Sequence, residues 1–263
     1  MGQNTALVLG LCSLPWRTVC SSIGGWLPLM TRRFLGMRMH QSWKNRRYRG
    51  VLLAACLLVT ASCESETLPP LDLPVGCNPL LAGVDCMLPF PSDFFLVDDA
   101  RLPSGKRIAV TGAAVVTSID DESANVYEVE TVDGFSLTPP IVAILGEPLS
   151  QFGLNTIFDQ PTKSIQTTHP TLLVNTKTLE LIPHFVDLDP RATSPDRQAM
   201  VIRPLVGLEE QTRYVVLLHG VQHLDGDTAQ APEGFRRIRD RQTRGDSVLE
   251  PLAKWYAKSI FPL

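Results

Sequence analysis

The sequence of 263 residues has few aromatic residues, few charges and no long apolar run. Aromatic residues make up 7% of the chain and charged residues 19%, whereas 44% of the residues are hydrophobic. That hydrophobic share excludes a wholly disordered chain. No run of about 18 or more apolar residues occurs, which argues against a protein that crosses a membrane several times. The 21 prolines favour short elements joined by many turns over long helices.

The sequence also lacks the usual motifs of nucleotide, zinc and serine-hydrolase chemistry. It contains no P-loop, no G-x-G-x-x-G, no paired zinc cysteines and no H-E-x-x-H. Neither G-x-S-x-G nor S-x-x-K, which would mark a serine nucleophile, occurs. We therefore expect no cofactor, and the chain by itself does not read as an enzyme.

Acidic residues are missing from residues 1–63, which carry eight of the 24 Lys and Arg side chains. Residues 64–263 hold the other 16 and all 27 Asp and Glu side chains, a net charge of −11. Binding to nucleic acid phosphates requires clustered cations, so this acidic part argues against a nucleic-acid partner. The sequence divides into a basic leader and an acidic body.

The leader contains the features of a secretory signal peptide in the usual order. A basic segment at residues 44–49 precedes GVLLAACLLVTASC, a short apolar run that ends with small residues at Cys63. This run is too short to span a hydrocarbon core of about 30 Å comfortably, although a transmembrane anchor remains the alternative. Residues 1–36 lie upstream of Met37 and Met39, either of which would supply a better start, so the first 36 residues point to a wrongly chosen start codon.

The end of the apolar run, Thr60-Ala61-Ser62-Cys63, resembles a bacterial lipobox, in which a peptidase cuts before a cysteine that receives lipid. Thr60 differs from the most common leucine at that position. Cys56 follows letters that fit better, but the apolar segment before it is too short. We therefore expect lipidation at Cys63 and attachment to a bacterial envelope membrane, at the outer membrane or cell surface.

Two cysteines remain in the exported body, Cys77 and Cys86. They frame CNPLLAGVDC, a segment rich in turn-forming residues, in a compartment that favours oxidation. A local disulfide is the expected state, and two free thiols are the alternative. The polar and proline-rich residues 64–76 indicate a flexible tether between the membrane and the folded body.

Short apolar runs bounded by turn residues fill residues 77–246 and predict a mostly β domain, an antiparallel Ig-like sandwich. The clearest local unit is a hairpin in which residues 172–174 and 179–182 flank the polar connection Asn175–Thr178. Pro183 places the following run at a sheet edge or a bulge. The expected strands are Arg107–Val110, Ala114–Ile119, Ile141–Leu145, Thr171–Val174, Leu179–Val186, Ala199–Ile202 and Arg213–Leu218.

The sequence predicts one good helix, near its end. Apolar residues from Val248 to Tyr256 recur at intervals of three and four after Asp246-Ser247, which can cap a helix. Residues 247–263 then read as a helix that begins a truncated continuation.

Three stretches carry a resemblance to a known family. They are residues 86–95 with 104–107, the hairpin end at residues 182–185, and the segment from Ile202 to Gly226. Together they resemble the N-terminal region of large bacterial envelope lipoproteins similar to virulence-factor-type lipases, and the third stretch also resembles the end of a bacterial Ig-like module. The resemblance covers roughly residues 77–260 and implies a displayed accessory domain. In such relatives a catalytic α/β-hydrolase portion often follows.

The resemblance leaves two classes of function. The preferred one is a non-catalytic, lipid-anchored envelope module with an unknown protein or envelope partner. The alternative is the N-terminal fragment of a secreted lipase or esterase whose catalytic part is missing. The strand ending in His219-Gly220 is how many α/β-hydrolases begin an oxyanion hole, but no nucleophile elbow accompanies it.

Weak metal candidates are His219, His223, Asp225 and Asp227, which lie close together in the sequence. Helical spacing does not apply to the two histidines at a strand end, and Asp-Gly-Asp is more often a turn than a calcium loop. His184 with Asp187 and Asp189 has the same standing, because alternation along a strand would put His184 and Asp187 on opposite faces. The basic run at residues 235–241 reads as a solvated connection into the last helix, or alternatively as a contact with anionic envelope polymer or lipid headgroups.

Overall fold

The computed structural model describes residues 7–11, 68–81, 85–116 and 132–263. All of these belong to one compact unit that spans residues 1–13 and 67–263. The expected lipidation site, Cys63, lies outside the described residues. The strands of the described part are β1 (Leu7–Leu11), β2 (Leu96–Asp98), β3 (Lys106–Ile108), β4 (Ile141–Ile144), β5 (Thr171–Asn175), β6 (His184–Leu188), β7 (Ala199–Pro204) and β8 (Tyr214–Leu218).

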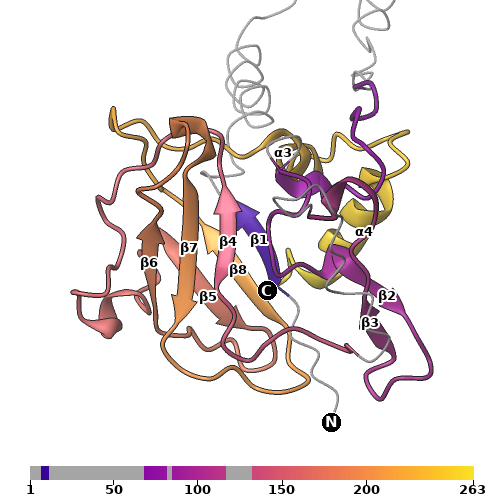
Figure 1. The fold of residues 1–263 in the computed structure, drawn as a ribbon, viewed down its shortest axis with the longest axis horizontal. Helices are drawn as coiled ribbons and strands as arrows, with labels where there is room; N and C mark the ends of the chain where they lie inside the picture. The colour runs from indigo at the N-terminus through magenta and orange to yellow at the C-terminus, as the bar shows by residue number, and fades with distance from the viewer. Residues whose placement is uncertain (1–6, 12–67, 82–84, 117–131) are drawn as a thin grey trace, which may run out of the picture. The chain divides into compact units, whose positions relative to one another are not determined.

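These strands form two three-stranded sheets, ordered β1-β8-β5 and β4-β7-β6, and the hairpin β2-β3. The pairs β5–β8, β4–β7, β6–β7 and β2–β3 are antiparallel, whereas β1 pairs with β8 in parallel. In Figure 1 the β4-β7-β6 sheet overlaps the other three-stranded sheet and lies nearer the viewer. The prediction of a mainly β fold is confirmed, and the parallel pair is a difference from an all-antiparallel expectation.

Burial along the strands explains their position in the sheets. The run YVVLL of β8 is buried at four of its five residues, as a central strand with both faces covered must be. In β6 and β7 the buried side chains alternate with partly exposed ones, so Val186 faces Ile202 across the sheet on its buried side. One main core therefore receives side chains from both three-stranded sheets.

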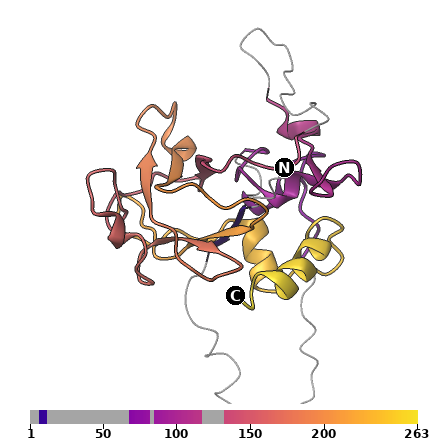
Figure 2. The same ribbon diagram turned by 90° about the horizontal axis from the view of Figure 1, so that it is seen from below.

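Two α-helices, α3 (Glu233–Arg239) and α4 (Leu249–Ser259), cover one side of the sheets (Figures 1 and 2). The helix expected after Asp246-Ser247 is confirmed as α4. The Asp246 carboxylate accepts hydrogen bonds from the backbone N–H groups of Val248 and Leu249 at 3.0 and 2.9 Å, which satisfies donors that the first helical turn leaves free. Short 3-10 turns at Pro79–Leu81, Asp93–Phe95, Gly112–Ala114, Pro161–Lys163 and Pro195–Arg197 complete the described elements.

The basic run at residues 235–241 is not a solvated connection, because most of it forms α3. Phe235 and Ile238 point into the main core. Arg237 is also buried, with its guanidinium bound to Glu233 at 2.7 Å and to the carbonyl oxygen of Pro69. The segment is an amphipathic helix, and the sequence did not predict it because only two apolar residues occur among several cations.

Two expected strands differ in the structure. Ala114 ends a 3-10 turn instead of starting a strand, and the run's last three residues, 117–119, lie outside the described part. The run Leu179–Val186 divides at Pro183, which has no N–H to donate to a ladder. Its first half forms only an isolated bridge between Leu181 and Val174, while His184 begins β6 at the edge of the other sheet, as expected after Pro183.

The hairpin turn itself is built by Asn175. Its side-chain oxygen accepts hydrogen bonds from the N–H groups of Lys177 and Thr178 at 2.9 and 3.3 Å, and Leu179 takes a left-handed φ of 61°. This Asx turn reverses the chain as the polar connection predicted.

Part of the stretch expected as a tether lies against the folded body. The N–H of Leu71 donates to Asp246 at 2.9 Å, in addition to the contact of Arg237 with Pro69. At Gly76 the chain passes so close to Thr111 that a Cβ would lie 2.0 Å from its carbonyl oxygen. A smaller second core, built on Phe95, Ile108, Val110, Ala114 and Phe135, holds the β2-β3 hairpin beside this segment.

Candidate functional site

The two cysteines of residues 64–263, Cys77 and Cys86, lie together. The sulfur atoms of Cys77 and Cys86 are 2.17 Å apart, within bonding distance for a disulfide. The N–H of Asn78 donates to the carbonyl oxygen of Cys86 at 2.9 Å, so backbone and side chains close the same short loop. This loop joins the docked segment before Cys77 to the residues that lead into β2.

The structure brings three of the four weak metal candidates to one hollow and leaves His219 outside it. His223, Asp225 and Asp227 line a hollow of about 450 Å³ together with Glu147, whose carboxylate lies 3.4 Å from the His223 ring. Asp225 and Asp227 form the turn of a small hairpin, in which the N–H of Asp227 donates to Asp225 at 3.0 Å. His219 does not line this hollow. Among the described residues no group of three or more His, Cys, Asp or Glu side chains is placed to hold a metal ion.

His219 follows the last residue of β8 and is half-buried. Its N–H donates to the carbonyl oxygen of Pro170 at 2.8 Å. The side-chain Nε2 is buried and has no hydrogen-bond partner in the described part of the chain. A general base needs a nucleophile within hydrogen-bond reach, and no described side chain provides one to His219.

His184 lies fully buried in the core between β5 and β6. Its Nδ1 donates to the carbonyl oxygen of Ile182 at 2.8 Å, so its Nε2 accepts the hydroxyl hydrogen of Thr171 at 2.8 Å. Its ring also meets the buried His169 ring edge to face, with centroids 5.8 Å apart. Burial lowers the pKa of both histidines, because it disfavours the charged imidazolium.

The two aspartates considered with His184 lie elsewhere. Asp187 is partly exposed and pairs with Arg203 at 2.9 Å, and Asp189 pairs with Arg191 at 3.2 Å. His184 and Asp187 are thus on opposite faces of β6, as strand alternation predicted. The structure does not bring these three residues together as a site.

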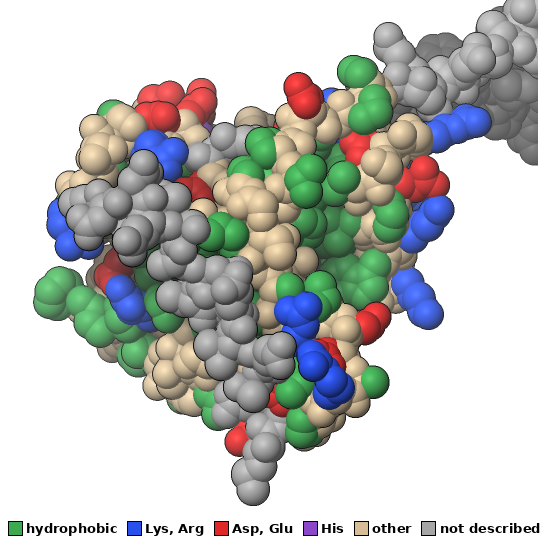
Figure 3. Space-filling view, turned by 45° about the vertical axis from the view of Figure 1, so that its right-hand side comes forward, with side chains coloured by type: hydrophobic (Ala, Val, Ile, Leu, Met, Phe, Trp, Pro, Cys, Tyr) green, Lys and Arg blue, Asp and Glu red, His purple; other side chains and the backbone are tan. Residues whose placement is uncertain are grey.

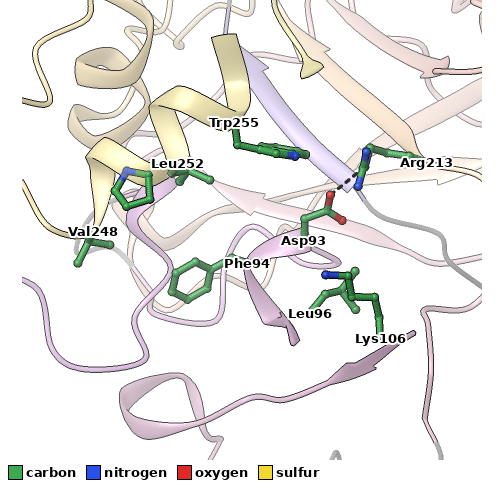
Figure 4. Close-up of a pocket in the computed structure, with 9 residues that line it drawn as sticks. Asp93, Phe94, Leu96, Lys106, Arg213, Val248, Leu252 and Trp255 are labelled. Atoms are coloured by element: carbon green, nitrogen blue, oxygen red, sulfur yellow. Dashed lines mark hydrogen bonds and ion pairs between the residues drawn. The ribbon is translucent and has the colours of Figure 1, made fainter. Parts of the chain in front are cut away.

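A hollow of about 360 Å³ beside α4 combines apolar walls with paired charges (Figure 4). We call it the α4 pocket. Figure 3, turned to bring this side of the molecule forward, shows hydrophobic side chains gathered on the surface with Lys and Arg at their border. The residues that line the α4 pocket are Asp93, Phe94, Leu96, Lys106, Arg213, Val248, Pro251, Leu252 and Trp255.

Three parts of the chain supply the polar end of the α4 pocket. Ser92 caps the 3-10 turn that carries Asp93, Lys106 opens β3, and Arg213 precedes β8. Arg213 Nε donates to Asp93 Oδ2 at 2.9 Å, and the guanidinium carbon lies 5.1 Å from the centre of the Trp255 ring. A cation at this distance from an indole gains a cation–π attraction. Arg213 is therefore fixed from two sides.

The carboxylate of Asp93 is mostly buried, with 17% of its side chain exposed. Burial raises the pKa of Asp93 to about 6, although Arg213 and Lys106 oppose this shift. Its second oxygen, Oδ1, is buried without a hydrogen-bond partner among the described residues. Lys106 pairs with Asp98, whose side chain is 90% exposed, at the rim.

Sequence reasoning did not find the α4 pocket. Asp93 and Arg213 are 120 residues apart in the sequence, and neither belongs to a motif. The sequence feature that could have pointed to the α4 pocket is the cluster of aromatic and acidic residues after Ser92. In the sequence analysis this cluster supported only the family resemblance. Chemically, the α4 pocket offers an apolar surface next to an oriented guanidinium.

No helix in the described ranges is long and apolar enough to cross a membrane. Comparison of the chain with protein-family models, with curated proteins and with solved structures found no match. A function must therefore be argued from the residues and their arrangement.

Proposed function

We propose that the protein is an exported, lipid-anchored module of the bacterial cell envelope that has no catalytic activity of its own. The observation that carries this proposal is the Cys77–Cys86 pair at the start of the folded body. Disulfides persist in oxidising compartments and are rare in the bacterial cytosol. The signal-like segment ends at Cys63, and residues 64–76 connect it to this body.

The surroundings of His219 support the non-catalytic part of the proposal. The His219-Gly220 pair directly after β8 is the feature that most resembles a hydrolase. In acyl transfer the imidazole must reach a nucleophile and be oriented by a further group. The described residues offer His219 Nε2 no such contact, and Pro170 holds its backbone at the strand end.

We further propose that the two sheets are an Ig-like sandwich, and processing at Cys63 would remove β1 from the edge of the β1-β8-β5 sheet. The antiparallel pairs β5–β8, β4–β7 and β6–β7, and the single core between the sheets, support the sandwich. Amide hydrogen exchange tests it, because strands that share one core should open as one cooperative unit. Separate opening free energies for the two sheets would contradict the sandwich.

Replacement of Cys63 tests export and lipidation in a bacterial host that expresses the full chain. We expect the wild-type protein to incorporate labelled fatty acid and to migrate at its processed mass. Cys63→Ser should carry no label, because the sulfur that accepts the lipid is missing.

The matched control is Cys56→Ser, which changes the other cysteine of the same apolar run. We expect it to be labelled and processed like the wild type. Label retained by Cys63→Ser, or lost only in Cys56→Ser, would contradict lipidation at Cys63. An unlabelled wild-type protein held in the membrane at precursor mass would favour the transmembrane anchor.

A further inference from the structure

We propose that the α4 pocket binds a small organic anion, with its carboxylate on Arg213 and its apolar body against α4. This inference concerns a ligand and goes beyond the proposed role as an anchored module. It rests on three features of the α4 pocket: the free donors of one guanidinium, the apolar walls and the available volume.

Arg213 presents its donors in a fixed orientation. Its Nε is bound to Asp93, and its guanidinium stacks over Trp255 at 5.1 Å. The two terminal nitrogens have no hydrogen-bond partner among the described residues, and 41% of the side chain is exposed. A guanidinium held this way offers a planar fork that matches a carboxylate, and little side-chain entropy remains to be lost on binding.

The apolar body of the ligand would lie along α4. Leu252 and Trp255 project from successive turns of this helix, and Phe94 stands on the opposite wall (Figure 4). Val248 is 46% exposed at the mouth. The volume of about 360 Å³ lies in the range of ligand sites. A volume at this lower end of the range suits a medium-length acyl chain or a fused aromatic ring.

The charges of the α4 pocket allow an anion. Asp93 is already paired with Arg213, and its unpartnered oxygen is closed to solvent, so it does not present a free negative charge to the hollow. Lys106 is 42% exposed, and its ion pair in the described part of the chain is with the solvated Asp98. Such a surface pair contributes little, so the ammonium group of Lys106 can turn to the ligand at small cost.

Fluorescence of Trp255 provides a direct test. The chain has four tryptophans, of which Trp16, Trp26 and Trp43 lie before Cys63. The processed protein would carry Trp255 alone, and replacing the other three with Phe gives the same single tryptophan in the unprocessed chain. We expect octanoate to give a saturable blue shift of its emission, because an acyl chain displaces water from the indole. The neutral analogue 1-octanol should give no saturable shift over the same concentrations.

Arg213→Lys keeps the charge but removes the fork, and we expect it to weaken octanoate binding about tenfold or more. The matched control is Arg203→Lys. Arg203 donates from Nε to Asp187 at the same 2.9 Å and is 46% exposed, but it does not line the α4 pocket. It should leave octanoate affinity unchanged.

Val248→Asp provides a second variant in case Arg213→Lys does not fold. It places a negative charge at the exposed mouth of the α4 pocket, and we again expect a tenfold or greater loss. A wild-type protein without a saturable octanoate response would overturn the proposal. Equal binding of 1-octanol, or unchanged affinity in the folded variants, would overturn it as well.

Discussion

Replacing Gly234 with Ala tests the packing of α3 against the segment that begins the folded body. Gly234 is buried in the first turn of α3, and a Cβ built on it would lie 1.7 Å from the carbonyl oxygen of Pro79. An ordinary contact is about twice as long, so the helix or the 3-10 turn at Pro79–Leu81 must move. The obstacle is a buried backbone atom, which cannot rotate away as a side chain can.

The expected magnitude follows from two opposing effects. Ala favours a helix over Gly by at most about 1 kcal/mol. Overpacking a buried site costs about 1–3 kcal/mol, and so close an approach belongs at the upper end. The net loss in unfolding free energy should be about 2 kcal/mol. For a domain of this size that corresponds to a melting temperature lower by roughly 4–8 °C.

Thermal unfolding followed by circular dichroism measures this difference. The control is Gly207→Ala, whose added Cβ meets nothing within 4 Å. It should be neutral, or stabilising by up to about 1 kcal/mol, because the substitution only restricts the unfolded chain. A Gly234→Ala protein that melts at or above the wild-type temperature would refute the close contact of α3 with Pro79.

Three further predictions concern the buried histidines, the cysteine pair and His219. The lowered pKa of His184 means that its contribution to stability is present above pH 6.5 and is lost as the pH falls. In urea unfolding, the stability advantage of the wild type over His184→Gln should therefore shrink from pH 7.5 to pH 5.5. A stability difference that stays constant over this range would exclude this role of His184. Replacing both Cys77 and Cys86 with Ser should lower the unfolding free energy by about 2–3 kcal/mol, since it opens a short covalent loop. Mass spectrometry of the unreduced wild type should show one linked peptide pair. Two alkylatable thiols would disprove the disulfide. The purified protein should not turn over short-chain p-nitrophenyl esters, and ester hydrolysis that disappears in His219→Ala with an unchanged circular dichroism spectrum would favour the hydrolase alternative.

The sequence predicted the elements whose patterns are local. The run from Tyr214 to Leu218 is continuous and rich in valine and leucine, so it could be recognised as a buried strand without knowledge of its neighbours. The helix after Asp246 could be predicted because a capping residue and an apolar period coincide. The Asn175 turn could be predicted since its side chain bonds only to the next few residues.

Features that depend on distant partners were not predictable in this way. The residues of β6 are strand-like, but only the fold determines that they pair with β7 and not with β5. Helix α3 was not predicted, because its many charges outnumber its two buried apolar residues. Pro232, immediately before the helix, is a typical helix start and could have indicated it. The α4 pocket depends on a contact between Asp93 and Arg213, which no local period encodes.

The docking of the incoming chain on α3 and α4 affects the order in which the protein can fold. Leu71 bonds to a residue 175 positions later, and Pro69 to one 168 positions later. Contacts of such high sequence separation form slowly, because a long loop must close before they contribute. In a protein exported as proposed, the first folded segment cannot complete these two contacts until the two helices have also crossed the membrane. Until then the segment around Leu71 remains undocked. It would be vulnerable to proteases and to aggregation for as long as the rest of the chain is being translocated.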